Sequence, residues 1–259
     1  MARSLPAVAP ASVVAFAPRD HVRRLVRAAF PRRQGRVVVA RSAAEFSRLL
    51  RAELVDAAVL DAAGGDDVWT VAGLARELPS VPFVAVVPSR AADAGLLARA
   101  VDADVADVVL DGVDGEVLAA LVEPLRFTSR LRLALDEPPT ALQLSSPLQQ
   151  AVWHALVAIA GRPTTTAALA ERFGVTREHL SRSFATGGAP TLKRAIDLVR
   201  VCVAAELAKN PGYDVADVAR ILGFASSSHL ATTTQRLVGT RPSSLARLRT
   251  VDLVERFTL

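Results

Sequence analysis

Two segments in the last third of the chain share one pattern, and this pattern constrains the fold more than any other feature. Residues 166–184 and 215–230 each have apolar residues at helical spacing, then a glycine, then a more polar stretch. The glycine is expected where the first helix closes. Two helices joined in this way form a helix-turn-helix unit, which can place its second helix in a DNA major groove. The sequence therefore predicts two such units, joined by a helix.

Positive charge is concentrated in the half of the chain that carries these two units. Residues 1–122 contain 14 arginines and 15 acidic residues, a net charge of −1. Residues 123–259 contain 17 basic and 11 acidic residues, a net charge of +6. Binding to DNA phosphates requires an excess of Arg and Lys on the contacting domain. The charge asymmetry therefore agrees with the helix-turn-helix prediction.

The composition restricts where the chain works. Cys202 is the only cysteine, which excludes an intramolecular disulfide and favours a reducing compartment, the cytoplasm. No apolar run approaches the length of a membrane span, so no membrane partner is expected. The first 17 residues faintly resemble a signal peptide, but Pro6 and Pro10 interrupt the apolar stretch and residues 12–17 are needed as a strand.

The first 122 residues alternate short apolar runs with amphipathic stretches. Five strand-helix units of this length predict a parallel sheet covered on both faces by helices. Ser42 followed by Glu45 predicts a capping box at the second helix. The predicted strands are 12–17, 36–40, 57–60, 83–87 and 108–110, and the predicted helices are 20–30, 43–54, 68–78, 91–100 and 116–125.

The rest of the chain divides into a linker and a helical domain. Residues 123–145 read as the linker, because Asp136-Glu-Pro-Pro-Thr140 stops any helix. Residues 146–259 look all-helical, beginning with a helix over 148–160 that has Trp153 and Val157 on its apolar side. An apolar stripe predicts the long connecting helix and consists of Leu192, Ile196, Val199, Val203 and Leu207. Other expected helix starts are marked by caps at Thr165 or Thr166 and at Asp214, and by Pro242.

The helical domain, over about residues 148–249, carries a set of residues at characteristic spacings: Leu180, Ser181, Arg182, Phe184, Arg200, Ala204, Val218-Ala219, Gly223-Phe224 and Gly239-Thr-Arg-Pro242. In these residues it resembles the DNA-binding domain of the AraC/XylS family of bacterial transcription regulators. The resemblance implies that two recognition helices lie in successive major-groove segments on one face of DNA. Three positions of the second unit depart from the family pattern: Thr232 replaces a frequent arginine, Thr234 a core phenylalanine and Leu230 another aromatic residue.

Each recognition helix carries candidate DNA-contacting residues. In the first, about residues 176–184, Leu180 and Phe184 are four apart and face the core, so the polar residues face outward. Arg182 matches the arginine that reaches base edges in the family, and an arginine can bind guanine O6 and N7 together. The candidates in this helix are Arg177, Glu178, His179, Ser181 and Arg182.

The second recognition helix spans about residues 226–237. Its three consecutive threonines lose rotamer freedom in a helix, so we expect a looser module that contacts phosphates more than it reads bases. Ser228 and His229 are its best candidates for base contact, and Arg236 is its candidate for the DNA backbone. The full set of candidates is Ser226, Ser227, Ser228, His229, Thr232 and Arg236.

The first 122 residues resemble a response-regulator receiver domain, with Asp61 in the phosphoacceptor position after the third strand. The rest of that chemistry is missing. Ala17-Pro18 occupies the places of the acidic pair that would hold Mg²⁺, Val87-Pro88 replaces a hydroxyl residue and Asp111 replaces a lysine. Without the metal or the lysine, the developing phosphoryl charge has no partner. Asp61 therefore reads as a vestigial phosphoacceptor.

The predicted fold is an α/β, flavodoxin-like (receiver-like) domain with a five-stranded parallel sheet over 1–122, followed by an all-α double helix-turn-helix domain over 146–259. The predicted function is that of a sequence-specific transcription regulator that works without phosphorylation. Its N-terminal domain serves self-association, as a homodimer, or senses a partner or ligand. The expected partner is double-stranded DNA, with RNA polymerase as a further candidate. No catalytic residue, cofactor or metal site is predicted, and the four histidines share no ligand spacing.

Two alternatives stay open at this point. One is a two-component response regulator that is phosphorylated on Asp61. The other is a DNA-repair enzyme that uses an AraC-like DNA-binding domain. Such an enzyme needs a reactive cysteine in an exposed motif, whereas Cys202 lies inside the predicted connecting helix and reads as a packing residue.

Overall fold

A computed structural model describes residues 11–90 and 93–259, and it divides the chain into two compact units. Of the described residues, one unit contains 11–90 and 93–130 together with Asn210–Asp217. The other contains Leu131–Lys209 and Val218–Leu259. Among the described residues, no helix is both long and apolar enough to cross a bilayer. The signal-peptide resemblance falls mostly on residues 1–10, which lie outside the described ranges.

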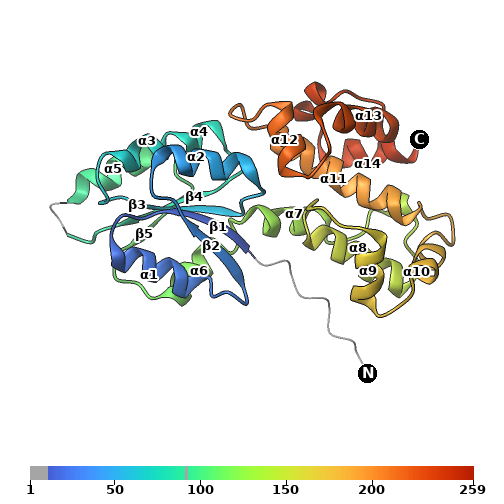
Figure 1. The fold of residues 1–259 in the computed structure, drawn as a ribbon, viewed down its shortest axis with the longest axis horizontal. Coiled ribbons are helices and arrows are strands. Elements are labelled where there is room, and N and C mark those ends of the chain that lie inside the picture. The colour runs from blue at the N-terminus through green and yellow to red at the C-terminus, as the bar shows by residue number, and fades with distance from the viewer. Residues whose placement is uncertain (1–10, 91–92) are drawn as a thin grey trace. The chain divides into compact units, whose positions relative to one another are not determined.

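The first unit is built on a five-stranded sheet with the order β2-β1-β3-β4-β5, in which every neighbouring pair is parallel (Figure 1). This order is that of flavodoxin-like doubly wound sheets. The predicted receiver-like fold class is therefore confirmed. The strands are β1 (Ala11–Phe16), β2 (Gly35–Val39), β3 (Ala57–Asp61), β4 (Phe83–Val87) and β5 (Asp107–Leu110).

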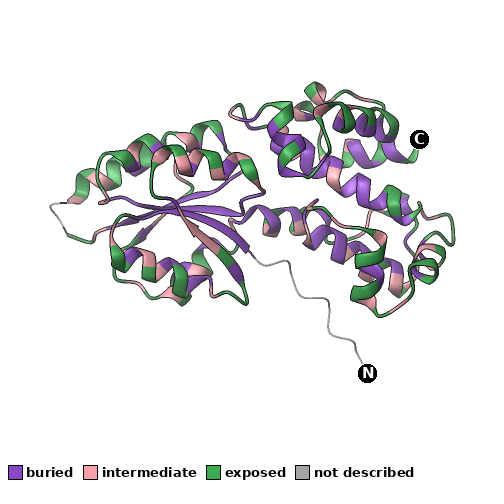
Figure 2. Cartoon of the chain, viewed as in Figure 1, coloured by how far each residue is buried: buried purple, intermediate pink, exposed green. Residues whose placement is uncertain are grey.

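Helices cover both faces of this sheet. In Figure 1, α1 and α6 lie on one face, and the helices α2 to α5 lie on the other. The central strands are buried on both sides (Figure 2), as a parallel sheet between helix layers requires. The helices are α1 (Asp20–Ala29), α2 (Ala43–Ala52), α3 (Asp67–Ala72), α4 (Leu74–Glu77), α5 (Ala94–Asp102) and α6 (Gly115–Val122).

Three details of this unit differ from the sequence prediction or extend it. The single helix expected over 68–78 is two short helices, α3 and α4, that meet at Gly73. The fourth expected helix begins at Ala94, and its expected first residues, 91 and 92, lie outside the described ranges. Ser42 caps α2 by accepting the Glu45 N–H, but the Glu45 carboxylate accepts the N–H of Arg41, so the full capping box does not form.

The chain expected to be a linker contains two helical segments, α7 (Phe127–Leu135) and the 3₁₀-helix η2 (Thr140–Leu142). The start of α7 is tied to the sheet by Asp56, which is fully buried. The Asp56 carboxylate accepts the Ser12 N–H at 2.8 Å and the Thr128 N–H at 3.2 Å, and its carbonyl accepts the Phe127 N–H. A buried carboxylate with these donors fixes the direction in which the chain leaves the sheet.

The remainder of the chain is helical, as predicted. Trp153 and Val157 are buried in α8, and the five residues of the predicted apolar stripe are all buried in α11. Thr165 and Asp214 accept N–H groups at the helix starts where caps were expected. The segments are α8 (Pro147–Ala158), α9 (Thr166–Phe173), α10 (Arg177–Phe184), α11 (Leu192–Ala208), α12 (Val215–Ile221), α13 (Ser227–Val238), η3 (Pro242–Arg247) and α14 (Thr250–Thr258).

Candidate functional site

The first helix-turn-helix unit consists of α9 and α10. Gly174 closes α9 with a φ of 64°, a left-handed conformation that glycine adopts without strain. Thr176 then caps α10, because its side chain accepts the His179 N–H at 3.2 Å. Leu180 and Phe184 are fully buried, which fixes the rotation of α10 about its axis.

A buried glutamine holds the end of this recognition helix. Gln149 of α8 is fully buried, and its side-chain nitrogen donates to the carbonyl oxygens of Phe184 at 2.8 Å and Thr186 at 3.0 Å. The Phe184 carbonyl is in the last turn of α10 and the Thr186 carbonyl lies just beyond it, where backbone carbonyls have no partner within the helix. No sequence pattern predicted this role for Gln149, because a glutamine on a helix is ordinarily exposed.

The outer face of α10 carries the predicted candidates. Arg177, Glu178, His179 and Arg182 are exposed, and Ser181 is partly exposed. Arg177 and Glu178 form an ion pair at 3.1 Å. A backbone N–H and then Arg177 hold the pKa of Glu178 below its ordinary value. Among the residues that the structure describes, none makes a hydrogen bond or ion pair with the Arg182 guanidinium.

The second unit repeats this geometry with α12 and α13. Gly223 has a φ of 64°, and a Cβ at this position would lie 2.4 Å from Cγ of Pro163. Both the backbone angle and the close approach therefore require glycine here. Ser226 caps α13 by accepting the His229 N–H at 3.1 Å. Two side chains contact the Phe224 ring. The central carbon of the Arg200 guanidinium lies 3.8 Å from the ring centroid, and the His229 ring makes an edge-to-face contact with it.

The three threonines of α13 do not interrupt the helix, which runs without a break to Val238. The Thr232 hydroxyl donates to the Ser228 carbonyl at 3.0 Å, and the Thr234 hydroxyl donates to the Ala231 carbonyl at 3.0 Å. Thr233 and Thr234 are buried in the core. The expectation of a looser second module concerns motion and stays a prediction.

The exposed face of α13 differs in chemistry from that of α10. Ser226, Ser228, His229 and Thr232 are exposed and Ser227 is partly exposed, so this helix offers hydroxyls and an imidazole. Arg236 is also exposed, but its guanidinium forms an ion pair with Asp197 at 3.2 Å. The predicted phosphate contact of Arg236 therefore competes with an ion pair inside the domain.

The second candidate site surrounds Asp61 at the end of β3. Asp61 is fully buried, and Arg19 is its partner. The Arg19 backbone N–H donates to one carboxylate oxygen at 3.1 Å, and Nε donates to the other at 2.8 Å. The same guanidinium reaches Asp111 at 3.1 Å, and His21 Nε2 lies 2.8 Å from the same Asp111 oxygen.

The charges of this cluster are the reverse of those in a phosphorylated receiver domain. An arginine follows β1, where a receiver has acidic residues, and the carboxylate of Asp111 follows β5, where a receiver has a lysine. The guanidinium of Arg19 lies between two carboxylates, so the cation is part of the chain. Its hydrogen bond to Asp61 raises the pKa of Arg19. Burial pushes the pKa of Asp111 upward, but His21 and Arg19 outweigh burial and hold it below the ordinary value. No group of three or more potential metal ligands occurs within the described ranges.

Sequence reasoning placed Asp61 and Asp111 at this site but missed Arg19 and His21. Both follow β1, after the Ala17-Pro18 pair that replaces the expected carboxylates. An arginine one residue beyond the lost acidic pair is the signal that could have been used.

The thiol of Cys202 is not placed to react. Cys202 is fully buried within α11, and burial raises the pKa of its thiol to about 12. A reactive cysteine requires a thiolate and access. This environment gives no support to the repair-enzyme alternative.

Comparison with known proteins agrees with the helical geometry. Residues 169–247 match a family described as a helix-turn-helix domain, a range that runs from α9 to η3. No curated protein matches the chain in sequence.

Several solved structures are similar to parts of the chain. A response regulator from Thermotoga maritima has 19% identity and a TM-score of 0.39, over 45% of this chain and 98% of its own. Full-length FixJ from B. japonicum has 12% identity and a TM-score of 0.40, over 87% of this chain and 96% of its own. The helix-turn-helix match covers both of the capped and glycine-closed units, so residues 169–247 form a double helix-turn-helix domain, the arrangement that the AraC-type resemblance predicted.

Proposed function

We propose that this chain is a sequence-specific transcription regulator that binds double-stranded DNA without being switched by phosphorylation. The observation that carries the proposal is the pair of recognition helices, α10 and α13, each of which begins at a side-chain cap and exposes a polar face. Only α10 carries an arginine without a partner among the described residues, Arg182. We therefore assign base reading chiefly to the first unit.

The surrounding charge supports binding to DNA phosphates. The helical half of the chain carries the whole positive excess, +6 over residues 123–259. Each phosphate that a basic side chain neutralises releases counterions, so affinity rises as salt falls. Because its target is DNA, we expect the protein to work in the cytoplasm.

Independence from phosphorylation is supported by the Arg19 contacts. Both carboxylate oxygens of Asp61 accept hydrogen bonds from Arg19, so neither is free to attack a phosphoryl donor. The carboxylate of Asp111 stands where a receiver would supply a cation. A phosphoryl group would add about two negative charges next to this second carboxylate.

Self-association through the sheet domain is supported by apolar side chains at the β5 edge. β5 is an outermost strand, and its last residue, Leu110, is 55% exposed. The helices next to it in sequence expose Leu97 and Val101 on α5 and Val117 and Leu121 on α6. Exposed apolar residues on an outermost strand, and on the helices that precede and follow it, are typical of protein interfaces. We propose that a homodimer forms there.

The proposal is tested by selecting binding sites from random duplex DNA with the full chain and then titrating the selected duplex at several salt concentrations. We expect enrichment of a defined sequence and a fall of log K with log salt of about 0.9 per phosphate contact. Absence of binding even at low ionic strength would overturn the DNA-binding role. Binding without any enriched sequence would overturn sequence specificity.

A further inference from the structure

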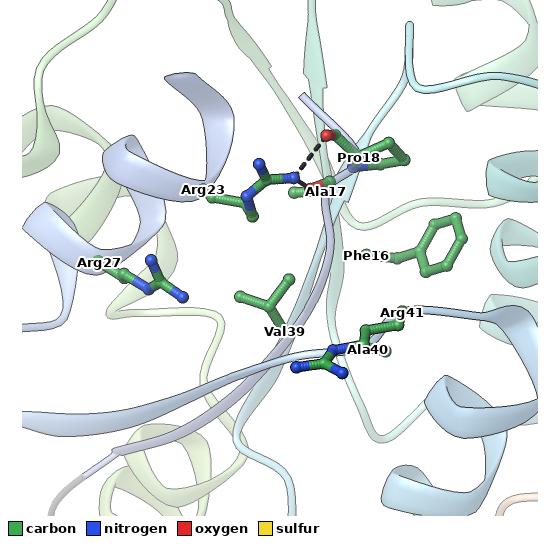
Figure 3. Close-up of a pocket in the computed structure, with 8 residues that line it drawn as sticks. All are labelled: Phe16, Ala17, Pro18, Arg23, Arg27, Val39, Ala40 and Arg41. Carbon is green, nitrogen blue, oxygen red and sulfur yellow. Dashed lines mark hydrogen bonds between the residues drawn. The ribbon is translucent and has the colours of Figure 1, made fainter. Parts of the chain in front are cut away.

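A pocket lies beside the ends of β1 and β2. It is separate from the recognition helices, the Asp61 cluster and the β5 edge, which carry the proposed function. Its volume is about 460 Å³, within the range of small-molecule sites. It opens at the carboxyl ends of parallel strands, where doubly wound sheets bind their ligands. One wall is apolar, with Ala17, Pro18 and Val39, and the others carry Arg23, Arg27 and Arg41. Figure 3 shows the three guanidinium groups around Val39.

One of the three arginines is held in place by the protein. The Arg23 guanidinium donates to the carbonyl oxygens of Ala17 and Pro18, as the dashed lines in Figure 3 mark. It also donates to the Asp20 carboxylate at 2.6 Å. A guanidinium fixed by three acceptors needs little further ordering when a ligand binds.

The other two arginines, Arg27 and Arg41, are exposed, and their guanidinium groups have no direct partner among the described residues. Within the described ranges, no residue accepts a hydrogen bond from the guanidinium of Arg27 or Arg41 or forms an ion pair with it. The nearby Asp20 already pairs with Arg23 and with Arg24 at 2.9 Å. The described residues that line the pocket include no acidic side chain.

Three guanidinium groups close together repel one another mildly, and an anion bound between them would relieve this repulsion. Arg23 and Arg27 are four residues apart on α1, a spacing at which like charges destabilise a helix. Arg41 adds a third positive charge from the end of β2. A phosphate group has about two negative charges and three terminal oxygens, so it can accept hydrogen bonds from all three guanidiniums. A carboxylate, in contrast, has two oxygens, and a single guanidinium can bind both of them.

We propose that this pocket binds a small molecule bearing a phosphate group, with its phosphate on Arg23, Arg27 and Arg41 and its less polar part on Val39 and Pro18. The inference goes beyond the proposed function and supplies a ligand class for the ligand-sensing role that the sequence analysis expected of the N-terminal domain. It does not involve Asp61, so a phosphate here is bound and not transferred.

The test is isothermal titration calorimetry of the full chain with glycerol 3-phosphate and inorganic phosphate as probes, and with succinate for comparison. We expect both phosphate probes to bind, glycerol 3-phosphate more tightly, and succinate to bind more weakly. The double variant Arg27→Gln/Arg41→Gln should weaken binding of glycerol 3-phosphate roughly tenfold or more, because each charge-assisted hydrogen bond contributes on that scale.

Two control variants locate the site. Arg33→Gln makes the same charge change in an exposed arginine just before β2, at the opposite end of that strand, and should leave phosphate affinity unchanged. Arg182→Gln removes a positive charge from the DNA-binding helix and should also leave it unchanged. Equal weakening by Arg33→Gln or Arg182→Gln would overturn the assignment to this pocket. Binding of succinate as tight as that of glycerol 3-phosphate would overturn the ligand class.

Failure of this inference is distinguishable from failure of the DNA-binding role. The same Arg27→Gln/Arg41→Gln protein is titrated with duplex DNA in the absence of any phosphate probe, where we expect wild-type affinity. A wild-type protein that binds phosphate but not DNA would support the phosphate site and contradict the regulator assignment. One that binds DNA but not phosphate would support the regulator assignment and contradict the phosphate site.

Discussion

Arg19 replaces, from within the chain, the cation that a phosphoacceptor aspartate needs beside it. Its guanidinium and its backbone N–H hold both oxygens of Asp61, which is fully buried, and the guanidinium also bonds Asp111. In metal-dependent phosphoryl transfer, the cation must also contact the incoming phosphoryl group. A guanidinium whose donors are already engaged by two carboxylates has little capacity for that contact.

The first prediction is that Asp61 does not accept a phosphoryl group. Incubation of the full chain with acetyl phosphate and Mg²⁺, followed by intact-mass measurement, should show no added phosphate. Asp61→Asn serves as the control, and it should bind DNA like the wild type. A phosphate-sized mass gain that disappears in Asp61→Asn would instead support a two-component response regulator.

The second prediction concerns stability. Arg19→Ala leaves the Asp61 carboxylate buried without its partner, so we expect the free energy of unfolding to fall by about 3 kcal/mol. Arg24→Ala removes an exposed arginine of α1, the helix that follows Arg19, and should change the free energy of unfolding by less than about 0.5 kcal/mol. Urea unfolding of both variants measures the difference. Equal, small effects would show that the Arg19–Asp61 pair contributes no net stability.

The third prediction is a pH dependence that comes from Asp111. Its pKa lies below the ordinary value of 3.8 because His21 and Arg19 outweigh the effect of burial. A carboxyl group with a lowered pKa in the folded state stabilises the fold above its unfolded pKa, and this contribution is lost as pH falls through the folded pKa. Wild type should therefore melt above Asp111→Asn at pH 6, and the difference should shrink below about pH 4.

Thermal melts from pH 3 to 6 measure this effect, with Asp102→Asn as an exposed control that should follow the wild type throughout. A difference between wild type and Asp111→Asn that stays constant over the whole range would contradict the ionic origin of the contribution.

The spacing of apolar residues, together with helix-capping residues, was enough to predict most of the fold. The strand over 83–87 was placed at its observed bounds, because a buried parallel strand is a short continuous apolar run between breakers. The rotation of α10 followed from Leu180 and Phe184, since two apolar residues four apart define one helix face. α14 was not predicted, although it buries Leu253, Val254 and Phe257.

The charge cluster at Asp61 was only half predictable. Strand ends could be aligned from the pattern, so Asp61 and Asp111 were expected at one edge of the sheet. Where a long flexible side chain such as that of Arg19 ends depends on the register of β1 against β3 and on the turn after β1, and neither is encoded in periodicity. The ion pair of Arg236 with Asp197 was also not predicted, because the two residues lie on different helices and periodicity does not show how those helices pack.

The fourth prediction addresses the proposed dimer. Val101→Glu/Leu110→Glu places two charges at the β5 edge, where both native side chains are more than half exposed. Burying these charges in an interface is costly, so the variant should sediment as a monomer at concentrations where the wild type sediments as a dimer. Leu133→Glu, an exposed leucine of α7, should leave the dimer intact. A wild type that stays monomeric at every concentration would remove the self-association proposal.

The last prediction ranks the two recognition helices. Arg182→Ala should relax sequence preference more than Thr232→Ala does. The Arg182 guanidinium is free to bind a guanine at two points, which is worth roughly 1–3 kcal/mol of base discrimination. The Thr232 hydroxyl already donates to the Ser228 carbonyl, so its removal takes away at most an acceptor for a base donor. Binding-site selection with each variant, read position by position, should show degeneracy appearing in one half-site for Arg182→Ala and almost none for Thr232→Ala. If Thr232→Ala relaxed the preference more, α13 and not α10 would be the helix that reads the sequence.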